Sequence, residues 1–433
     1  MAGNILVIGA GSSGIFTSIE LARRGLSVKL IDRGMAGSGT SLRFHGLLHS
    51  GARYAVVDNA SAVECREESS RILEAAPHCV EQTGGLFVAL NAEEEAYGEL
   101  LATELRRCSI PYHYNDSEET LKIEYNLNPA ARCSLSVQDN VLKGGMFIAC
   151  SILTAVNLGV NFLPFTELAG AEFEGRRIRA VRTRNVLSGL NEKTETDFVI
   201  NCSGPWVGET SALLGNRIET LPAAGVMSVV ARRLSIRVLN RMRRPSDGDI
   251  LVPYGSRTIA GTTAAVSYDV TSFDIDEEDV RLLREEAAAM VPLVSQLGFT
   301  RSYASFRPLL KDDSDGDARK ASRDFRIVRD ETKVENLVTV VGGKMTTCML
   351  VGEKAAEETL TAMGSSAGPR KPLKLFNPLD SRTEGRNGDV WHSTQGAALL
   401  DMLRGGTDEE EMIPAALFLS LLGGKEGDRR ESA

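Results

Sequence analysis

The hydrophobic pattern at the start of the chain predicts a βαβ unit. Residues 4–8 form a continuous apolar run of strand character, residues 13–24 have helical periodicity, and residues 27–32 form a second strand-like run. These elements fit within about thirty residues, which is typical of a parallel sheet covered by helices.

A helix is predicted next, between Asp58 and about Ala76. Ser61 and Glu64 have the spacing of a capping box near its start, and Pro77 would end it.

The later periodic segments add a second sheet and further helices. Helical periodicity predicts helices at residues 92–108 and 277–291, and from the turn at 342–344 to about 363. Strand patterns occur at 85–90, in hairpin-like runs at 162–184 (with Glu174-Gly175 as the turn) and 196–202, in long runs at 222–232, 249–263 and 301–309, and at 336–341.

Nucleotide-binding segments thus alternate with segments of the second sheet, and we expect two discontinuous domains. The nucleotide-binding domain is predicted to comprise residues 1–80, 140–220 and 320–365, and the other domain residues 81–139 and 221–319. Ser, Pro, Gly and charge clusters predict a C-terminal helical extension at 366–433, with short helices near 393–404 and 410–421 and a disordered tail.

Composition argues against several classes of protein. The formal net charge of -9 over 433 residues gives no bulk electrostatic support to nucleic-acid binding. The seven cysteines include no C-x-x-C pair, which argues against zinc ribbons and cysteine-ligated clusters and favours reduced thiols in the cytoplasm. We expect no cleavable leader, and no stretch of about 18 apolar residues would span a membrane.

A dinucleotide fingerprint joins the first strand to the first helix. Gly9, Gly11 and Gly14 have the G-x-G-x-x-G spacing that allows a tight turn, approach of a pyrophosphate and close packing of helix on strand. Asp32 ends the second strand, where a carboxylate can hold ribose hydroxyls. The motif alone leaves FAD and NAD open.

The segment from Gly37 to Tyr54 is dense in small residues and carries two histidines and two arginines. His45 and His49 are four residues apart, a spacing that metal ligands have on a helix. Gly46 and Gly51 argue against a helix, and no carboxylate or cysteine lies close by, so we expect no metal. A polar loop with structural histidines is the simpler alternative.

Residues 45–55 resemble the flavin-facing stretch of the FAD-dependent glycerol-3-phosphate dehydrogenases. Within that family they most resemble the large catalytic subunit of the bacterial anaerobic enzyme. Further matches occur in consistent order over roughly residues 4–363, at 201–206, 249–253, 261–263, 303–309 and 342–347.

The resemblance implies an α/β fold with a glutathione-reductase-like FAD-binding domain and a D-amino-acid-oxidase-like antiparallel substrate domain. It implies oxidation of sn-glycerol 3-phosphate to dihydroxyacetone phosphate by hydride transfer to FAD. Electrons would pass to a quinone, a partner subunit or oxygen. The FAD is expected to be non-covalent, because neither histidine lies in a motif associated with flavin attachment.

The resemblance also implies site residues. Arg53, Tyr54 and Arg307 would bind the anionic substrate, since guanidinium groups suit phosphate or carboxylate. His49 is the candidate base. Lys344, before a helix N-terminus, would stabilise reduced flavin. The residues expected to contact FAD are Gly9, Gly11, Ser13, Gly14, Asp32, Arg33, Thr40, Ser41, His45, Gly46, Leu48, Ser203, Gly204, Trp206, Gly343, Lys344, Met345 and Thr346.

The sequence departs from the family pattern in three places. Met227 stands where some members have a histidine, and Thr347-Cys348-Met349 follows the closing motif where the family often has Thr-Tyr-Arg. No cysteine follows Cys348, whereas the large subunit of the anaerobic enzyme has a C-terminal cysteine-rich domain. Any iron–sulfur cluster would then belong to a separate polypeptide, or would be absent.

Several alternatives stay open at this point. The substrate of the same fold could be a 2-hydroxy acid such as 2-hydroxyglutarate, or another phosphorylated polyol. The chain could be a non-catalytic flavin-binding subunit of an electron-transfer complex. An NAD-dependent dehydrogenase is disfavoured by the motif at 342–347. The apolar face of 410–421 lacks a Lys/Arg-rich polar side, so a protein partner is favoured over direct lipid binding, and we expect a cytoplasmic protein, peripheral at the inner face of the membrane at most.

Overall fold

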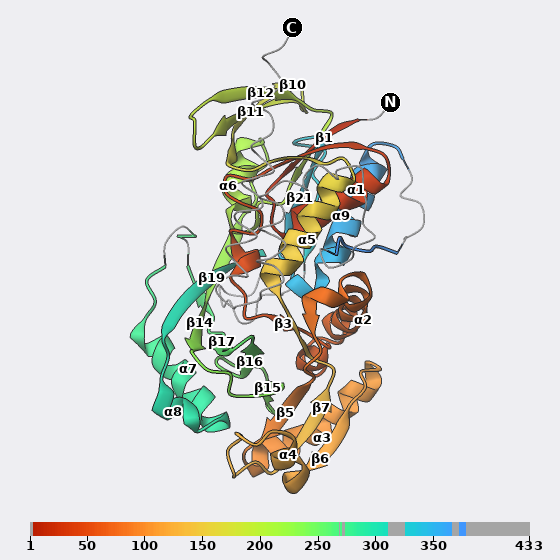
Figure 1. The fold of residues 1–433 in the computed structure, drawn as a ribbon. Helices are drawn as coiled ribbons and strands as arrows, with labels where there is room; N and C mark the ends of the chain where they lie inside the picture. The colour runs from red at the N-terminus through yellow and green to blue at the C-terminus, as the bar shows by residue number, and fades with distance from the viewer. Residues whose placement is uncertain (1–2, 268, 271–272, 311–324, 366–371, 378–433) are drawn as a thin grey trace. The chain divides into compact units, whose positions relative to one another are not determined.

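The computed structural model describes residues 3–267, 269–270, 273–310, 325–365 and 372–377. The chain forms two compact units (Figure 1). The first unit comprises Met1–Leu42, Gly145–Pro222 and Arg307–Ala433, and the second comprises Arg43–Gly144 and Ala223–Phe306. No helix within the described ranges is long and apolar enough to cross a membrane.

A six-stranded sheet forms the core of the first unit. Its order is β20-β21-β13-β1-β2-β9, and β1 pairs in parallel with both β2 and β13. The predicted strands at 4–8 and 27–32 are confirmed. The bounds are β1 Asn4–Ile8, β2 Ser27–Ile31, β9 Asn161–Leu163, β13 Phe198–Asn201, β20 Arg326–Val328 and β21 Leu337–Val341.

Helices α1 (Ser12–Arg23) and α9 (Cys348–Ala362) pack against this sheet, and α5 (Gly144–Asn157) contacts α1. The rings of Phe16 and Phe147 lie 5.6 Å apart between α1 and α5. A Cβ atom on Gly352 would lie 2.5 Å from the backbone carbon of Phe16, so this glycine allows α9 to cross α1 closely. The short helix α6 (Val207–Leu213) follows β13.

A three-stranded antiparallel sheet completes the first unit. It contains β10 (Thr166–Glu174), β11 (Arg177–Asn185) and β12 (Asn191–Glu195). The hairpin predicted at 162–184 is confirmed in its turn, where Gly175 has a φ of 60°. The hairpin-like interpretation of 196–202 is wrong, because β13 is a parallel strand between β1 and β21.

The second unit is built on a mostly antiparallel sheet of nine strands. Its order is β18-β14-β17-β16-β15-β5-β7-β6, with β19 paired to β14, and β15 runs parallel to β5. The bounds are β5 Gly85–Ala89, β6 His113–Asp116, β7 Cys133–Val137, β14 Thr220–Val230, β15 Val238–Arg241, β16 Ile250–Tyr254, β17 Arg257–Gly261, β18 Ala265–Val266 and β19 Arg301–Leu310.

This sheet confirms the strand predictions at 222–232 and 301–309. The long strand expected at 249–263 is instead the hairpin of β16 and β17, because Gly255 turns the chain with a φ of 55°. A small antiparallel sheet of β3 (Leu47–Leu48), β8 (Asn140–Leu142) and β4 (Val80–Glu81) lies in the same unit.

Five α-helices belong to the second unit, among the residues that the structure describes. They are α2 Asn59–Ala75, α3 Ala92–Arg107, α4 Ser117–Ile123, α7 Glu277–Met290 and α8 Leu293–Leu297.

The predicted capping box of α2 is wrong in its residues. Asp58 is the N-cap, and its carboxylate accepts a hydrogen bond from the Ser61 N–H at 3.0 Å. A capping box forms instead at α4, between Asp116 and Glu119.

The unit boundaries differ from the predicted ones at residues 43–80, which the structure groups with the second unit. The reason is packing: α2 contributes Ala62 and Cys65 to a core that includes Phe87, Leu101 and Leu135. Residues 140–144 join the same unit through β8, and residues 307–310 fall in the first. The helices expected at 393–404 and 410–421 lie outside the described residues.

Candidate functional site

The turn between β1 and α1 needs glycine for steric reasons. Gly9 has a φ of 100°, and a Cβ there would lie 2.5 Å from the Cys202 carbonyl oxygen. A Cβ on Gly14 would lie 1.8 Å from the Gly9 carbonyl oxygen. The sequence fingerprint therefore corresponds to a real tight turn, with the second glycine, Gly11, at the N-cap of α1.

The N-terminus of α1 is arranged as an anion site. Gly11 has no side chain to cap the helix, and the Ser41 hydroxyl accepts a hydrogen bond from the Ser12 N–H at 3.0 Å. The N–H groups of the first helical turn carry partial positive charge and can bind phosphate oxygens. The hydroxyls of Ser12 and Ser41 lie 3.4 Å apart beside them.

Asp32 follows β2 and is held by backbone donors. Its Oδ2 accepts from the Ala10 N–H at 2.7 Å and its Oδ1 from the Gly34 N–H at 2.8 Å. Burial raises the pKa of Asp32, and the two backbone donors oppose that rise. Each carboxylate oxygen can accept a further hydrogen bond, which fits the two hydroxyls of a ribose.

Trp206 offers the first unit's clearest unsatisfied donor. Its indole Nε1 is buried and has no hydrogen-bond partner among the described residues. The Arg33 guanidinium lies 4.0 Å from the Trp206 ring centroid, a cation–π contact. Gly39 packs against the same ring, where a Cβ would lie 3.3 Å from Cζ3. An orphaned buried N–H beside a glycine-rich segment fits a polar cofactor.

The closing motif turns the chain from β21 into the 3₁₀ turn Met345–Thr347. Gly342 and Gly343 have φ values of 83° and 104°, which only glycine adopts readily. The Thr347 hydroxyl accepts from the Lys344 N–H at 3.4 Å. This turn leads directly into α9, so the segment carries the positive end of a helix as predicted.

In the second unit, the loop before β3 is shaped by His45 and Gly46. The His45 Nδ1 accepts a hydrogen bond from the Leu47 N–H at 3.1 Å, which in this geometry requires that nitrogen to be unprotonated. Gly46 has a φ of 89°, and a Cβ there would lie 2.5 Å from the Tyr254 ring. Its carbonyl accepts from the Leu142 N–H at 2.7 Å.

His49 lies in a group of aromatic rings. It is 8% exposed, and its ring centroid lies 6.1 Å from that of His45 and 5.3 Å from that of Tyr54. Tyr54 is 9% exposed and belongs to the core that α2 helps to form. The substrate role predicted for Tyr54 stays a prediction, beside this packing role.

The backbone next to His49 is anchored by a residue that sequence reasoning missed. The Ser50 N–H and hydroxyl both donate to Asp139 Oδ1, each at 2.7 Å, and the Asn240 amide donates to Oδ2 at 3.2 Å. Asp139 is 1% exposed, and burial raises its pKa against these hydrogen bonds. Asp139 lies between β7 and β8, two strands that the sequence analysis did not predict, and a single acidic residue there gave no signal that it would reach Ser50.

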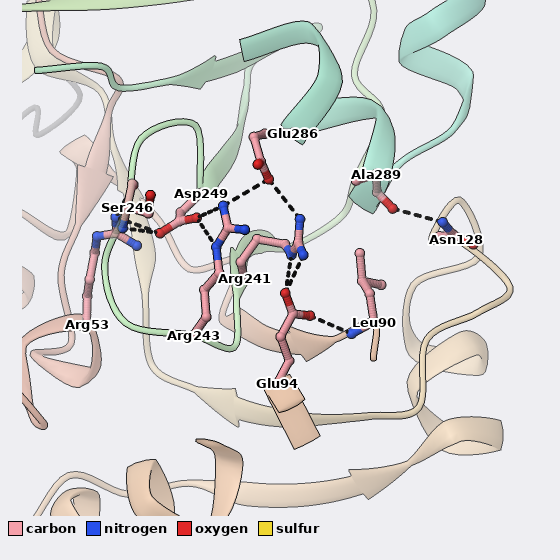
Figure 2. A network of polar contacts seen from close by, with 10 residues as sticks. All are labelled: Arg53, Leu90, Glu94, Asn128, Arg241, Arg243, Ser246, Asp249, Glu286 and Ala289. Carbon is pink, nitrogen blue, oxygen red and sulfur yellow. Dashed lines mark hydrogen bonds and ion pairs between the residues drawn. The ribbon is translucent and has the colours of Figure 1, made fainter. Parts of the chain in front are cut away.

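Arg53 is buried beside Asp249, a second acidic residue whose contact the sequence analysis missed. Its side chain is 8% exposed, and its Nη2 lies 3.1 Å from the Ser246 carbonyl oxygen and 3.3 Å from Asp249 Oδ2. Asp249 is fully buried and also binds Arg243 (Figure 2). Burial raises the pKa of Asp249, whereas Arg53 and Arg243 lower it.

The predicted site residues divide between the units. Three catalytic or substrate residues, His49, Arg53 and Tyr54, lie in the second unit, whereas Arg307 on β19 and Lys344 lie in the first. The predicted cofactor residues of the first unit are Gly9, Gly11, Ser13, Gly14, Asp32, Arg33, Thr40, Ser41, Ser203, Gly204, Trp206, Gly343, Lys344, Met345 and Thr346, and those of the second are His45, Gly46 and Leu48. Their roles stay predictions.

Comparison with known proteins shows that this chain is similar in sequence to subunits of anaerobic glycerol-3-phosphate dehydrogenases. The A1 subunit of the anaerobic glycerol-3-phosphate dehydrogenase of Haloferax volcanii is 32% identical over 84% of this chain and 64% of its own length. The corresponding subunit of the Escherichia coli K12 enzyme is 32% identical over 84% of this chain and 68% of its own length. This chain thus spans slightly less than two thirds of the length of the Haloferax relative and slightly more than two thirds of the length of the Escherichia coli relative.

A solved structure supports the fold. The FAD-bound, dithionite-reduced L-alpha-glycerophosphate oxidase from Mycoplasma pneumoniae superposes with a TM-score of 0.68 at 20% identity, over 87% of this chain and 97% of that one. The profile of the DAO family, FAD dependent oxidoreductase, matches residues 4–358. The predicted α/β fold and the FAD cofactor are confirmed: this chain belongs to the DAO family of FAD-dependent oxidoreductases.

Proposed function

We propose that this oxidoreductase oxidises a small anionic alcohol, sn-glycerol 3-phosphate, to dihydroxyacetone phosphate. The observation that carries the proposal is the buried Arg53 guanidinium. Among the described residues, only its Nη2 has hydrogen-bond partners, the Ser246 carbonyl and Asp249. Arginine has five N–H donors, and its paired donors match a phosphate or a carboxylate. The names of the relatives supply the first substrate to test.

His49 is our candidate for the base that takes the hydroxyl proton of the substrate. An imidazole suits this role near neutral pH. The burial of His49 and the anchoring of Ser50 by Asp139 support it, because a base must be held within reach of the proton that it removes. FAD would supply the hydride acceptor.

Arg307 and Lys344 have proposed supporting roles. Arg307 would add a second guanidinium for the substrate anion. Lys344, with the N-terminal turn at Met345–Thr347, would stabilise negative charge on the reduced cofactor. The same arrangement could serve a carboxylate, so a 2-hydroxy acid such as 2-hydroxyglutarate is the second candidate substrate.

The electron acceptor is proposed to be a partner subunit or a quinone. The relatives are named as subunits of an anaerobic dehydrogenase, and this chain matches about two thirds of their length. A peripheral place at the inner face of the membrane, reached through such a partner, follows from the same proposal.

Anaerobic reduction tests the proposal. The purified protein is expected to show a flavin spectrum that bleaches at about 450 nm when glycerol 3-phosphate is added. If 2-hydroxyglutarate bleaches it and glycerol 3-phosphate does not, the substrate is a hydroxy acid. If dithionite reduces the flavin but no donor in a panel of phosphorylated polyols and hydroxy acids does, the chain is a flavin-binding subunit without turnover.

A further inference from the structure

A network of alternating charges runs through the second unit and ends at Arg53 (Figure 2). Each carboxylate in it lies between two cationic or N–H donors, and most of the side chains are buried. The members, in order, are Arg53, Asp249, Arg243, Glu286, Arg241 and Glu94.

The distances are short along the network. Arg243 Nη2 lies 2.7 Å from Asp249 Oδ1 and 2.9 Å from Glu286 Oε2. Arg241 Nη1 lies 2.8 Å from the same Glu286 oxygen, and its Nη2 binds Glu94 Oε1. Three cations and three carboxylates therefore alternate, and the network as a whole is neutral.

The two ends of the network differ. At the far end, Glu94 Oε2 accepts from the Leu90 N–H at 2.7 Å, so the last carboxylate is satisfied by backbone. At the near end the last member is a cation. Within the described chain, Arg53 Nε and Nη1 have no hydrogen-bond partner, although the side chain is only 8% exposed. An anion placed against these donors would continue the alternation.

Asp249 is itself rigidly fixed. Its Oδ1 accepts from both Arg243 Nε, at 2.8 Å, and Nη2, and its Oδ2 accepts from the Ser246 N–H at 2.5 Å. The carboxylate is fully buried, so it cannot turn toward solvent. Asp249 and the Ser246 carbonyl both accept from Arg53 Nη2, so they hold this nitrogen in place and leave Nε and Nη1 as donors for another group.

We infer that Asp249 is a positioning residue that aims the Arg53 guanidinium at the anionic group of the substrate. This inference rests on the proposed function. The Asp249 carboxylate repels an anion that approaches Nη2, so the phosphate or carboxylate binds through Nη1 or Nε, the donors that Asp249 does not hold. Asp249 therefore sets both the orientation of the arginine and the side from which the anion is bound.

The test compares four holoenzyme variants by steady-state kinetics with glycerol 3-phosphate. Asp249→Asn is expected to raise KM about tenfold with a smaller change in kcat, because it weakens substrate binding and leaves the proton-transfer group in place. Asp249→Glu should recover part of the loss. Arg243→Gln keeps Asp249 but removes the guanidinium group whose two nitrogens bind its carboxylate. This variant should raise KM about threefold.

Glu286→Gln is the matched control. It removes a carboxylate from the same network without touching Arg53 or its partner. Its KM should stay within about twofold of the parent value even if its melting temperature falls. If Asp249→Asn and Arg243→Gln leave KM as Glu286→Gln does, the inference is overturned, and the network serves stability alone.

A binding measurement separates this inference from the proposed function. Calorimetric titration of the holoenzymes with inorganic phosphate needs no turnover. The Arg53→Ala variant measures phosphate binding at other sites, and the difference from the parent is the binding that depends on Arg53. If no anionic alcohol reduces the flavin, the proposed function fails, but Arg53-dependent phosphate binding that is about tenfold weaker in Asp249→Asn still supports the inference. The inference is overturned if Asp249→Asn and the parent bind phosphate equally tightly through Arg53. It is also overturned if the parent shows no phosphate binding that depends on Arg53.

Discussion

The turn at the start of α1 and the loop that carries His49 and Arg53 are built by opposite means. The first is made of backbone: glycines without side-chain clashes and N–H groups at the start of a helix. The second is made of buried carboxylates, Asp139 and Asp249, which hold loop residues far away in sequence. The comparison shows that residues close together in the sequence determine a site made of backbone, whereas a site made of side chains depends on the whole fold.

The largest effect is expected at the backbone site. Gly14→Ala places a Cβ 1.8 Å from the Gly9 carbonyl oxygen, an overlap that should cost about 3 kcal/mol or more. We expect the purified variant to lose FAD about tenfold, measured as the ratio of flavin absorbance to protein absorbance.

Gly25→Ala is the control for that change. Gly25 also has a positive φ, 82°, but a Cβ there would meet no atom within 4 Å. It should cost only about 1–2 kcal/mol, with FAD content unchanged. Equal FAD loss in both variants would mean that general destabilisation, not the tight turn, controls cofactor binding.

At the side-chain site, Asp139→Ala should strand the Ser50 N–H and hydroxyl and the Asn240 amide in the core. Unsatisfied buried donors of this kind cost about 1–3 kcal/mol each, so the melting temperature should fall clearly. Turnover should fall about tenfold as well, because His49 loses its anchored neighbour.

Ser50→Ala gives the graded comparison. It removes the hydroxyl bond to Asp139 and keeps the backbone bond, so its loss of stability should be about 1 kcal/mol. A Ser50→Ala variant as impaired as Asp139→Ala would show that the hydroxyl, not the carboxylate, is the essential group.

A smaller effect concerns pH. Burial raises the pKa of Asp139 above its usual value, so the folded state holds the proton more tightly than the unfolded state. This stabilising contribution is full below the unfolded pKa and is lost as pH rises through the folded pKa. In denaturant titrations between about pH 4 and pH 7, the unfolding free energy should fall more steeply with pH for the parent than for Asp139→Asn. Parallel curves would place the ionised form of Asp139 in both states.

The smallest effect is expected at Arg33, which stacks on Trp206. Arg33→Gln removes a cation–π contact that is typically worth about 0.5–1 kcal/mol at an exposed position. FAD affinity, measured by titrating apoprotein with FAD, should weaken a few-fold at most. A loss as large as that of Gly14→Ala would make this side chain a principal cofactor contact and narrow the contrast between the two sites.

The sequence predicted the tight turn between β1 and α1 well because its signals are local. The spacing of Gly9, Gly11 and Gly14 after an apolar run, with Asp32 at the end of the next strand, defines the turn without reference to the rest of the chain. The hairpin turn at Gly175 was predicted for the same reason.

The missed features depend on tertiary pairing. Nothing local indicates that Asp139 binds Ser50, 89 residues earlier, or that Asp249 binds Arg53, 196 residues earlier. The grouping of 43–80 with the second unit likewise follows from the packing of α2 against strands that lie later in the chain.

The close crossing of α9 over α1 has a consequence for biosynthesis. Gly352 contacts the backbone of Phe16, and the sheet around β1 is completed by β21 only at Leu337–Val341. The ribosome makes the intervening residues in roughly 20–70 s. Throughout that interval the fingerprint segment is already synthesised but lacks α9 and β21, so we expect the nascent chain to acquire FAD only after α9 has emerged.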